Sequence, residues 1–178
     1  MGQGPRTQEE NEKVKEEALV LFDSIHAVVD HSSDLAAIAL SSNDLETINQ
    51  AGKKAVYIGI ENGYPLGKDL SLVSSFYDLG ARYITLCHTR NNDICDSSTD
   101  RDGPEHGGLS GFGREVVREM NRLGIMIDVS HMSDEAFYDV LEVSQAPVIA
   151  SHSNAGRFVT IRETCLTKCW KNWLRMMV

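Results

Sequence analysis

The sequence has no long apolar run, few cysteines and no concentration of positive charge. Spanning a bilayer as a helix takes ~20 apolar residues in a row, and no such run occurs. The polar stretch 1–10 is not a signal peptide, so the chain as printed predicts a cytoplasmic product. A missing N-terminal leader or a lipid anchor would change this prediction of the localisation. The net charge of −9, without a basic stripe, argues against a nucleic-acid partner.

Cysteine usage and composition point to an ordinary packed domain. The chain has four cysteines without Cys-x-x-Cys spacing, which predicts reduced thiols rather than a disulfide framework. Hydrophobic residues make up 42% and charged residues 24%, which is typical of a soluble globular protein. The 178 residues are fewer than the ~250 that a complete (β/α)₈ barrel usually takes.

Helical and extended patterns alternate along the chain. The predicted helices are 8–29, one opened by Asn43, one near 69–79, then 110–123 and 133–144, with Leu123-Gly124 and Ser133 as end and start signals. The apolar runs that predict strands are 35–40, 55–60, 82–87, 125–130 and 147–151. In the first helix the apolar side comprises Val14, Ala18, Leu21, Phe22, Ile25 and Val28. Such alternation predicts an α/β protein with a parallel sheet.

Side chains that can bind a metal follow three of the predicted strands. His131 and His152 close two successive apolar runs, and Glu61 closes an earlier one. Active sites of (β/α) barrels lie at this end of the strands, whereas a doubly wound sheet gathers its site at one switch point. The spread of these residues over several strands favours the barrel. Imidazole and carboxylate are zinc ligands, so the pattern predicts a metal-dependent hydrolase.

Plainer roles exist for each of these residues. A lone histidine after a strand is more often a hydrogen-bonded structural residue than a ligand. Glu61 could cap a following helix, and His88 could anchor the loop 88–108, with even odds between that role and a functional one. Asp128 is a weaker candidate for bracing a ligand through a hydrogen bond.

Five ordered motifs resemble the membrane (renal-type) dipeptidase family of zinc peptidases. The segments are Ile58-Gly-Ile-Glu-Asn-Gly63, Tyr83-Ile-Thr-Leu-Cys-His-Thr-Arg-Asn-Asn92, Gly107-Gly-Leu-Ser-Gly-Phe-Gly-Arg114, Ile127-Asp-Val-Ser-His131 and Ala150-Ser-His-Ser-Asn-Ala155. The resemblance covers residues 2–155 and implies a metal-dependent hydrolase barrel of the (β/α)₈ (TIM) type that cleaves dipeptides with two zinc ions. It also implies that Glu61 bridges the zincs, that His131 and His152 bind the second zinc, and that His88 contacts the substrate.

The sequence departs from the family pattern at both ends. No His-x-Asp pair for the first zinc occurs, and the family's catalytic aspartate has no counterpart, so we assign no catalytic residue. We therefore expect a partial barrel that lacks its first and last strands and forms at most one good zinc site. Exposed strand edges also predict association, as a homodimer or non-specifically.

Residues 156–178 break the pattern of the preceding domain, 1–155. They hold five Lys/Arg and one Asp/Glu, a charge of +4 after a strongly acidic domain, and show no clear period. We hypothesise a single-base deletion after the Ala155 codon, because permitted codons in the shifted frame encode a peptide resembling the family's own continuation. Three functions remain: a zinc dipeptidase impaired in this form, a non-catalytic zinc-binding fragment, and a different barrel amidohydrolase.

Overall fold

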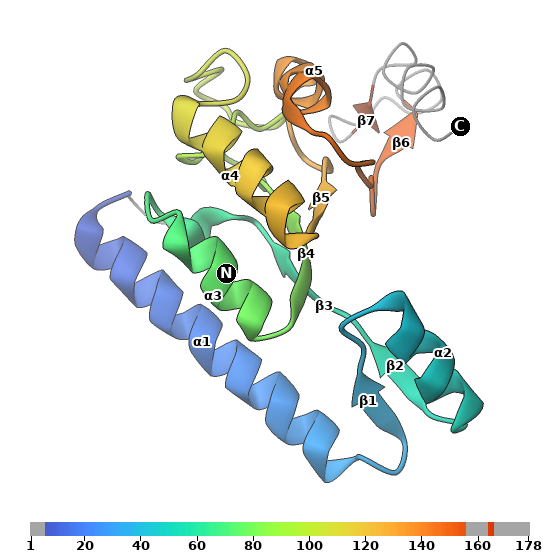
Figure 1. Cartoon of the computed structure of the whole chain (residues 1–178). Helices are drawn as coiled ribbons and strands as arrows, with labels where there is room; N and C mark the ends of the chain where they lie inside the picture. The colour runs from blue at the N-terminus through green and yellow to red at the C-terminus, as the bar shows by residue number, and fades with distance from the viewer. Residues whose placement is uncertain (1–5, 156–163, 166–178) are drawn as a thin grey trace.

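The computed structural model describes residues 6–155 and 164–165, and Figure 1 shows their arrangement. The helices are α1 (Gln8–His31), α2 (Ser42–Gln50), α3 (Ser71–Asp78), α4 (Gly111–Leu123) and α5 (Asp134–Val143), with a short 3₁₀ turn at Tyr64–Leu66. The strands are β1 (Ala36–Ile38), β2 (Lys54–Val56), β3 (Ile58–Glu61), β4 (Ala81–Thr85), β5 (Met126–Asp128), β6 (Asn154–Ala155) and β7 (Thr164–Cys165). The predicted alternation of helix and strand is confirmed, and the fold is mixed α/β.

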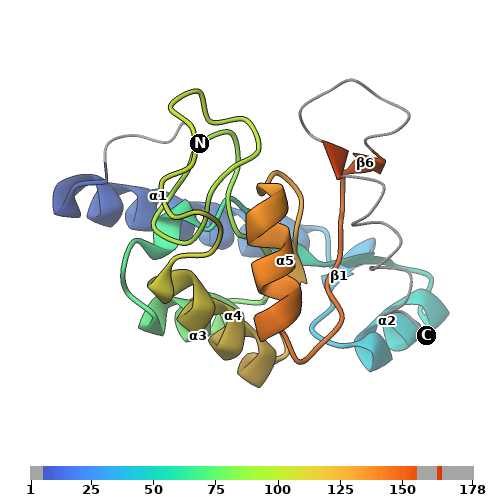
Figure 2. The ribbon, with the colours of Figure 1, turned by 90° about the horizontal axis from the view of Figure 1, so that it is seen from above.

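All the strand pairs are parallel within the described residues. Strand β4 lies between β3 and β5, and β1 pairs with β2 in a second small sheet. Helix α3 contacts β4 and α4, and α4 contacts β5 and α5, so each helix covers the strand that follows it. Seen from above in Figure 2, the long loop between β4 and α4 stands apart from α3 and α4.

The core lies between the β3–β4–β5 sheet and its helices. Phe76 of α3 is fully buried and stacks on Phe22 of α1, with ring centroids 5.6 Å apart. Ile84 of β4 and Val117 of α4 are also fully buried. These apolar contacts fix the sheet, and with it the strand ends that carry the candidate site.

Helix ends follow the predicted signals in two of three cases. Ser133 caps α5 through a hydrogen bond from the Ala136 amide, and Gly124 ends α4 in a left-handed conformation. The prediction that Asn43 opens α2 is wrong. Ser41 is the N-cap, since its side chain accepts a hydrogen bond from the Asp44 amide.

Two predicted strands differ from the structure. The run 55–60 is not one strand: it breaks at Tyr57 into β2 and β3, which belong to different sheets. The run 147–151 forms an isolated parallel bridge between Ile149 and Asp128 rather than a strand. Two backbone hydrogen bonds hold this segment to β5, from the Ile149 amide to the Ile127 carbonyl and from the Val129 amide to the Ile149 carbonyl.

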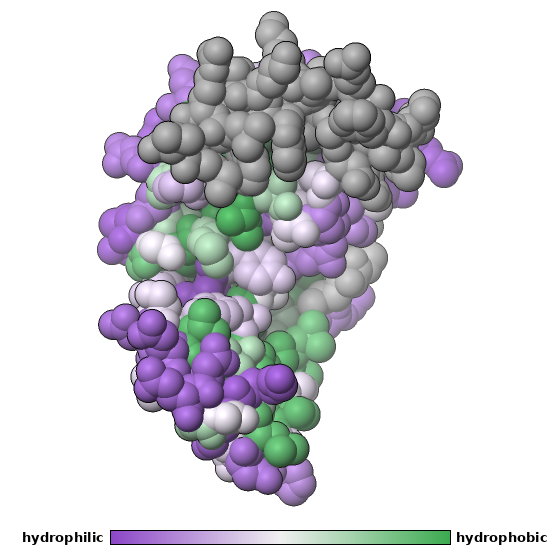
Figure 3. Space-filling view, turned by 90° about the vertical axis from the view of Figure 1, so that its right-hand side faces the viewer, coloured by the Kyte–Doolittle hydropathy of each residue, from purple (hydrophilic) through white to green (hydrophobic). Residues whose placement is uncertain are grey.

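Helix α1 is amphipathic, but its apolar side is wider than its buried side. Val14, Ala18 and Phe22 are buried, whereas Leu21 and Val28 are exposed. On another part of the surface, the face at the right-hand side of Figure 1, hydrophobic patches also lie among hydrophilic ones (Figure 3). No helix in the described ranges is both long and apolar enough to cross a membrane.

Two of the four cysteines lie within the described core. Cys87 and Cys95 are free and fully buried. A hydrogen bond with Cys87 and burial both raise the pKa of the Cys95 thiol well above its usual range. Cys95 is therefore an unreactive core residue. The side chains of the other two cysteines fall outside the described part of the structure.

Candidate metal centre

The register of the parallel strands brings the predicted ligands together. Glu61 pairs with Thr85, Thr85 with Asp128, and Asp128 with Ile149, so these four residues form one row across the sheet. His88, His131 and His152 each lie three residues beyond their member of this row. Because parallel strands end at the same edge, the equal offset brings the three imidazoles together just beyond the row. The Glu61 carboxylate, at the end of the row, lies beside them.

One carboxylate oxygen faces all three rings. Oε1 of Glu61 lies 3.3 Å from Nε2 of His152, 3.5 Å from Nε2 of His131 and 3.7 Å from Nε2 of His88. The Nε2 atoms of His131 and His152 are 2.6 Å apart. Four potential ligand atoms therefore converge on a small volume.

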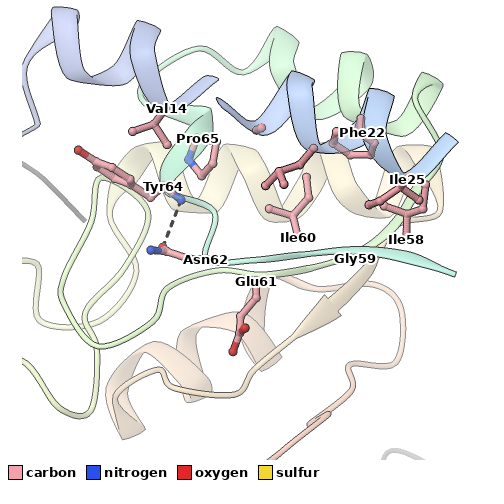
Figure 4. Close-up of a pocket in the computed structure, with 12 residues that line it drawn as sticks. Val14, Phe22, Ile25, Ile58, Gly59, Ile60, Glu61, Asn62, Tyr64 and Pro65 are labelled. Carbon is pink, nitrogen blue, oxygen red and sulfur yellow. Dashed lines mark hydrogen bonds between the residues drawn. The ribbon is translucent and has the colours of Figure 1, made fainter. Parts of the chain in front are cut away.

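The alternation of strand β3 explains why Glu61 reaches this volume. Ile58 and Ile60 face α1 across a cavity of about 280 Å³, and Figure 4 shows Glu61 pointing to the opposite side of the strand. Gly59 shares that opposite side with Glu61, and a Cβ there would meet the Tyr83 ring at 1.9 Å. The cavity beneath α1 is therefore an apolar space behind the site.

The side chains of the site differ widely in their exposure to solvent. The side chains of Glu61, His152 and His88 are 57%, 42% and 38% exposed, whereas that of His131 is 5% exposed. Histidine rings also contact one another: His131 lies edge-on to His88 and to His152, with centroids 4.3 and 4.6 Å away. His131 is therefore the buried member of the cluster.

Two residues of the site adopt left-handed backbone conformations. Asn62 has φ 80° and His131 has φ 69°, values that are uncommon outside glycine but enriched for Asn and His. The Asn62 side chain accepts hydrogen bonds from the Tyr64 amide and from Asn92 Nδ2, which ties the end of β3 to the following loop. Strained conformations of this kind concentrate at functional sites.

The loop between β4 and α4 holds the backbones of two histidines. Ser97 Oγ donates to the His88 carbonyl at 2.5 Å, and Ser98 donates to the His131 carbonyl from both its amide and its hydroxyl, at 2.8 and 3.0 Å. The sequence suggested His88 either as a functional residue or as a loop anchor. In the structure the His88 ring lies in the cluster around Glu61, and the His88 carbonyl accepts the hydrogen bond from Ser97 in the loop.

A buried carboxylate organises the same loop. Asp96 is 1% exposed and accepts hydrogen bonds from the backbone amides of Glu105, His106 and Gly108. Burial alone would raise the pKa of Asp96, but these amides lower it below its usual value. Sequence reasoning missed this residue, and the signal that could have found it is the density of Asn and Asp in 91–102.

Asp128 is buried directly beneath the histidines. Its carboxylate accepts hydrogen bonds from Thr85, from Ser130 and from Ser151, the last two being the residues before His131 and His152. Burial acts to raise the pKa of Asp128, yet the bonds from Ser151, Thr85 and the backbone hold it below its ordinary value. The carboxylate is therefore ionised at neutral pH and serves as an acceptor only.

The donor set suits a divalent transition metal. Imidazole and carboxylate ligands are those of zinc and its neighbours. The ligand atoms of Glu61, His88 and His131 all lie within 4.8 Å of one another. That trio differs from the predicted ligands Glu61, His131 and His152, although His152 lies nearest of the three histidines to Glu61. His88 thus shares the cluster with the predicted ligands.

A family model for "Membrane dipeptidase (Peptidase family M19)" matches residues 5–166. The chain belongs to this dipeptidase family. It is 44% identical over 134 residues to dipeptidase tcpJ of Claviceps purpurea, covering 75% of this chain and 31% of that protein. It is also 44% identical over 141 residues to human dipeptidase 3, covering 78% of this chain and 28% of the relative. The chain therefore spans about a third of the length of these curated relatives.

Solved structures agree with the family assignment. The probable dipeptidase PvdM from Pseudomonas aeruginosa matches with a TM-score of 0.90 and 30% identity, over 96% of this chain and 44% of that one. A metallopeptidase from Rhodobacter sphaeroides, solved with a phosphinate mimic of the dipeptide L-Ala-D-Ala, matches with a TM-score of 0.86 and 23% identity, over 93% of this chain and 48% of its own. At that lower identity the likeness shows the fold alone. Membership in a metallopeptidase family implies a metal, and the Glu61 cluster is the candidate site for it in the described residues.

Proposed function

We propose that this M19-family chain serves the metal-dependent hydrolysis of dipeptides, with zinc as the metal. The observation that carries the proposal is the convergence of Glu61 Oε1 with three histidine Nε2 atoms at the carboxyl ends of parallel strands. Curated relatives of the chain are named dipeptidases. The same row of strand ends supports a (β/α)₈ barrel of the TIM type, because that fold places its active site there.

Glu61, His131 and His152 would hold the metal. Glu61 would offer carboxylate oxygens, and each histidine would offer one ring nitrogen. A bound divalent ion supplies Lewis-acid polarisation of the peptide carbonyl and acidifies bound water. Nε2 of His131 and Nε2 of His152 would each supply one ligand atom, and the buried position of His131 excludes water from one side of the cluster.

His88 would contact the substrate. Its ring is partly exposed beside the buried His131, and the Ser97 hydroxyl fixes its backbone. An imidazole N–H at this position can donate a hydrogen bond to the carbonyl oxygen under attack, which stabilises the negative charge that develops there. The substrate therefore enters over His88 from the exposed side.

Metal titration of the purified chain tests the ligand assignment. Isothermal titration of the metal-depleted protein with Zn²⁺ should give a specific binding event that Glu61→Gln, His131→Ala and His152→Ala each weaken severely. The matched control is His31→Gln, which alters an exposed histidine in the last turn of α1. Equal zinc binding by the wild type and the three site variants would overturn the assignment.

Hydrolysis assays separate the remaining functions. A dipeptide panel, followed by chromatography of released amino acids with and without chelator, should show zinc-dependent cleavage. Zinc binding without cleavage of any amide would support the non-catalytic alternative instead. Cleavage of cyclic amides but not of dipeptides would support a different amidohydrolase.

A further inference from the structure

The Asp128 carboxylate joins the ends of β4 and β5 to the segment 147–151. It is fully buried, and it accepts five hydrogen bonds. Oδ1 accepts from the Ser130 amide and hydroxyl and from the Ser151 amide, at 3.1, 2.8 and 3.1 Å. Oδ2 accepts from the Thr85 hydroxyl at 2.7 Å and from the Ser151 hydroxyl at 2.5 Å. One oxygen thus faces backbone amides, and the other faces hydroxyl groups alone.

Ser151 connects this carboxylate to His152. Its Oγ lies 2.6 Å from Nδ1 of His152, on the opposite side of the ring from the Glu61 cluster. A hydroxyl has one proton to donate. Because Ser151 gives that proton to Asp128, its oxygen is left to accept from His152, which places the hydrogen of the neutral ring on Nδ1. In the metal-free chain, Nε2 of His152 then accepts across the 2.6 Å contact from Nε2 of His131.

The position of that hydrogen decides which nitrogen can bind a metal. With Nδ1 protonated, Nε2 of His152 carries a lone pair, and Nε2 is the atom that lies 3.3 Å from Glu61 Oε1. A hydrogen bond from the second ring nitrogen also fixes the ring's orientation and strengthens it as a ligand.

We propose that Asp128 and Ser151 are positioning residues that hold His152 in the Nδ1–H tautomer and so present its Nε2 to the metal. The metal itself rests on the function proposed above, but the tautomer is a property of the chain without metal. Neither residue is among the proposed metal ligands or the proposed substrate contact. Asp128 acts through Ser151, and Ser151 acts through His152.

The two oxygens of Asp128 make the effect of Asp128→Asn specific. The amide oxygen of Asn must face the Ser130 and Ser151 backbone amides, which cannot reverse direction. Its NH₂ group then faces the two hydroxyls and donates to Ser151 Oγ. Ser151 is left to donate its own proton to His152 Nδ1, so the ring should switch to the Nε2–H tautomer.

Two other variants keep the carboxylate and separate the relay from packing. Ser151→Ala removes the acceptor at His152 Nδ1. Thr85→Val removes a donor to the same Asp128 oxygen, and the Thr85 hydroxyl forms no hydrogen bond with a described histidine, so it is the matched control. Loss of a hydrogen bond behind a ligand typically weakens metal binding by about 10–100-fold. We expect that loss for Ser151→Ala and less than about threefold for Thr85→Val.

Nitrogen NMR of the metal-free, ¹⁵N-histidine-labelled chain tests the tautomer directly. At alkaline pH, wild-type His152, assigned by comparison with His152→Gln, should show a protonated Nδ1 and an unprotonated Nε2. Asp128→Asn should reverse the pair, and Thr85→Val should leave it unchanged. A protonated Nε2 in the wild type would overturn the proposal, as would an unchanged tautomer in an Asp128→Asn protein whose circular dichroism shows it folded.

Zinc titration of Ser151→Ala and Thr85→Val is the second readout, and it does not depend on Asp128→Asn folding. Equal weakening by the two variants would show that the carboxylate only supports packing. If wild-type His152 has the expected tautomer but the chain binds no zinc, the relay stands and the proposed function fails. If zinc binds and the tautomer is reversed, the function stands and the relay fails.

Discussion

Replacing Asp96 by Asn should destabilise the chain far more than its small change in shape suggests. Oδ1 of Asp96 accepts from the Glu105 and His106 amides at 2.9 and 3.0 Å, and Oδ2 accepts from the Gly108 amide at 2.9 Å. An Asn side chain must turn its NH₂ group toward one of these N–H groups. At least one buried amide then loses its partner and faces another donor.

The magnitude follows from the hydrogen bonds involved. A bond to a charged group contributes about 1.5–3 kcal/mol, and leaving a buried donor unsatisfied costs about 1–3 kcal/mol. The lost bond and the unsatisfied amide are partly the same loss, so the two energies are not simply added. We therefore expect Asp96→Asn to lower the free energy of unfolding by about 3 kcal/mol. For a chain of this size each kcal/mol corresponds to roughly 2–4 °C, so Tm should fall by about 6–12 °C at pH 7.

The stability difference should also depend on pH with a definite sign. The folded-state pKa of Asp96 is lowered, so its contribution is fully present above the unfolded pKa of ~3.9 and is lost as pH falls through the folded pKa. Thermal melts of both proteins from pH 7 downward should therefore show the gap in Tm closing below about pH 4.

Asp102→Asn is the control for this prediction. Asp102 is an exposed acidic residue of the same loop, so its change should move Tm by less than about 2 °C. A fall for Asp96→Asn as small as that of the control would refute the argument. So would a gap that stays constant down to pH 3.

Two further predictions concern packing. Gly59→Ala should lower the free energy of unfolding, measured in urea, by about 1–3 kcal/mol, because the new methyl group meets the Tyr83 ring. Adding Tyr83→Ala should remove most of that clash. Additive effects of the two changes would contradict this explanation. Phe76→Ala should cost about 3–5 kcal/mol, because it empties a fully buried site and removes the stack on Phe22, and a loss below about 1 kcal/mol would show that the core is not packed there.

The sequence predicted those parts of the fold that depend on local signals. Ser133 and Gly124 mark helix ends correctly because a cap needs only a short-range hydrogen bond or a left-handed residue. The start of α2 was misplaced because four adjacent residues, 41–44, are all good N-caps and local propensity does not choose among them. The break at Tyr57 depends on which strand each half pairs with, and that information is not local.

The candidate site was predictable in its residues but not in its support. Glu61, His88, His131 and His152 were identified in advance, and the structure brings all four together, while their roles as ligands and substrate contact remain predictions. The equal offset of the three histidines from one row could not be seen without the strand register. The density of Asn and Asp in 91–102 marks this loop, but it does not single out Asp96, because the partners of Asp96 are backbone amides.

The left-handed backbone at His131 limits what could ever replace it. With φ at 69°, the position tolerates His, Asn, Asp and Gly, and it penalises β-branched residues. Of these four, only His and Asp are common metal ligands. His131→Asp would exchange a nitrogen ligand for an oxygen ligand and keep the left-handed backbone conformation. It is therefore the first substitution to make when the metal preference of this centre is to be changed.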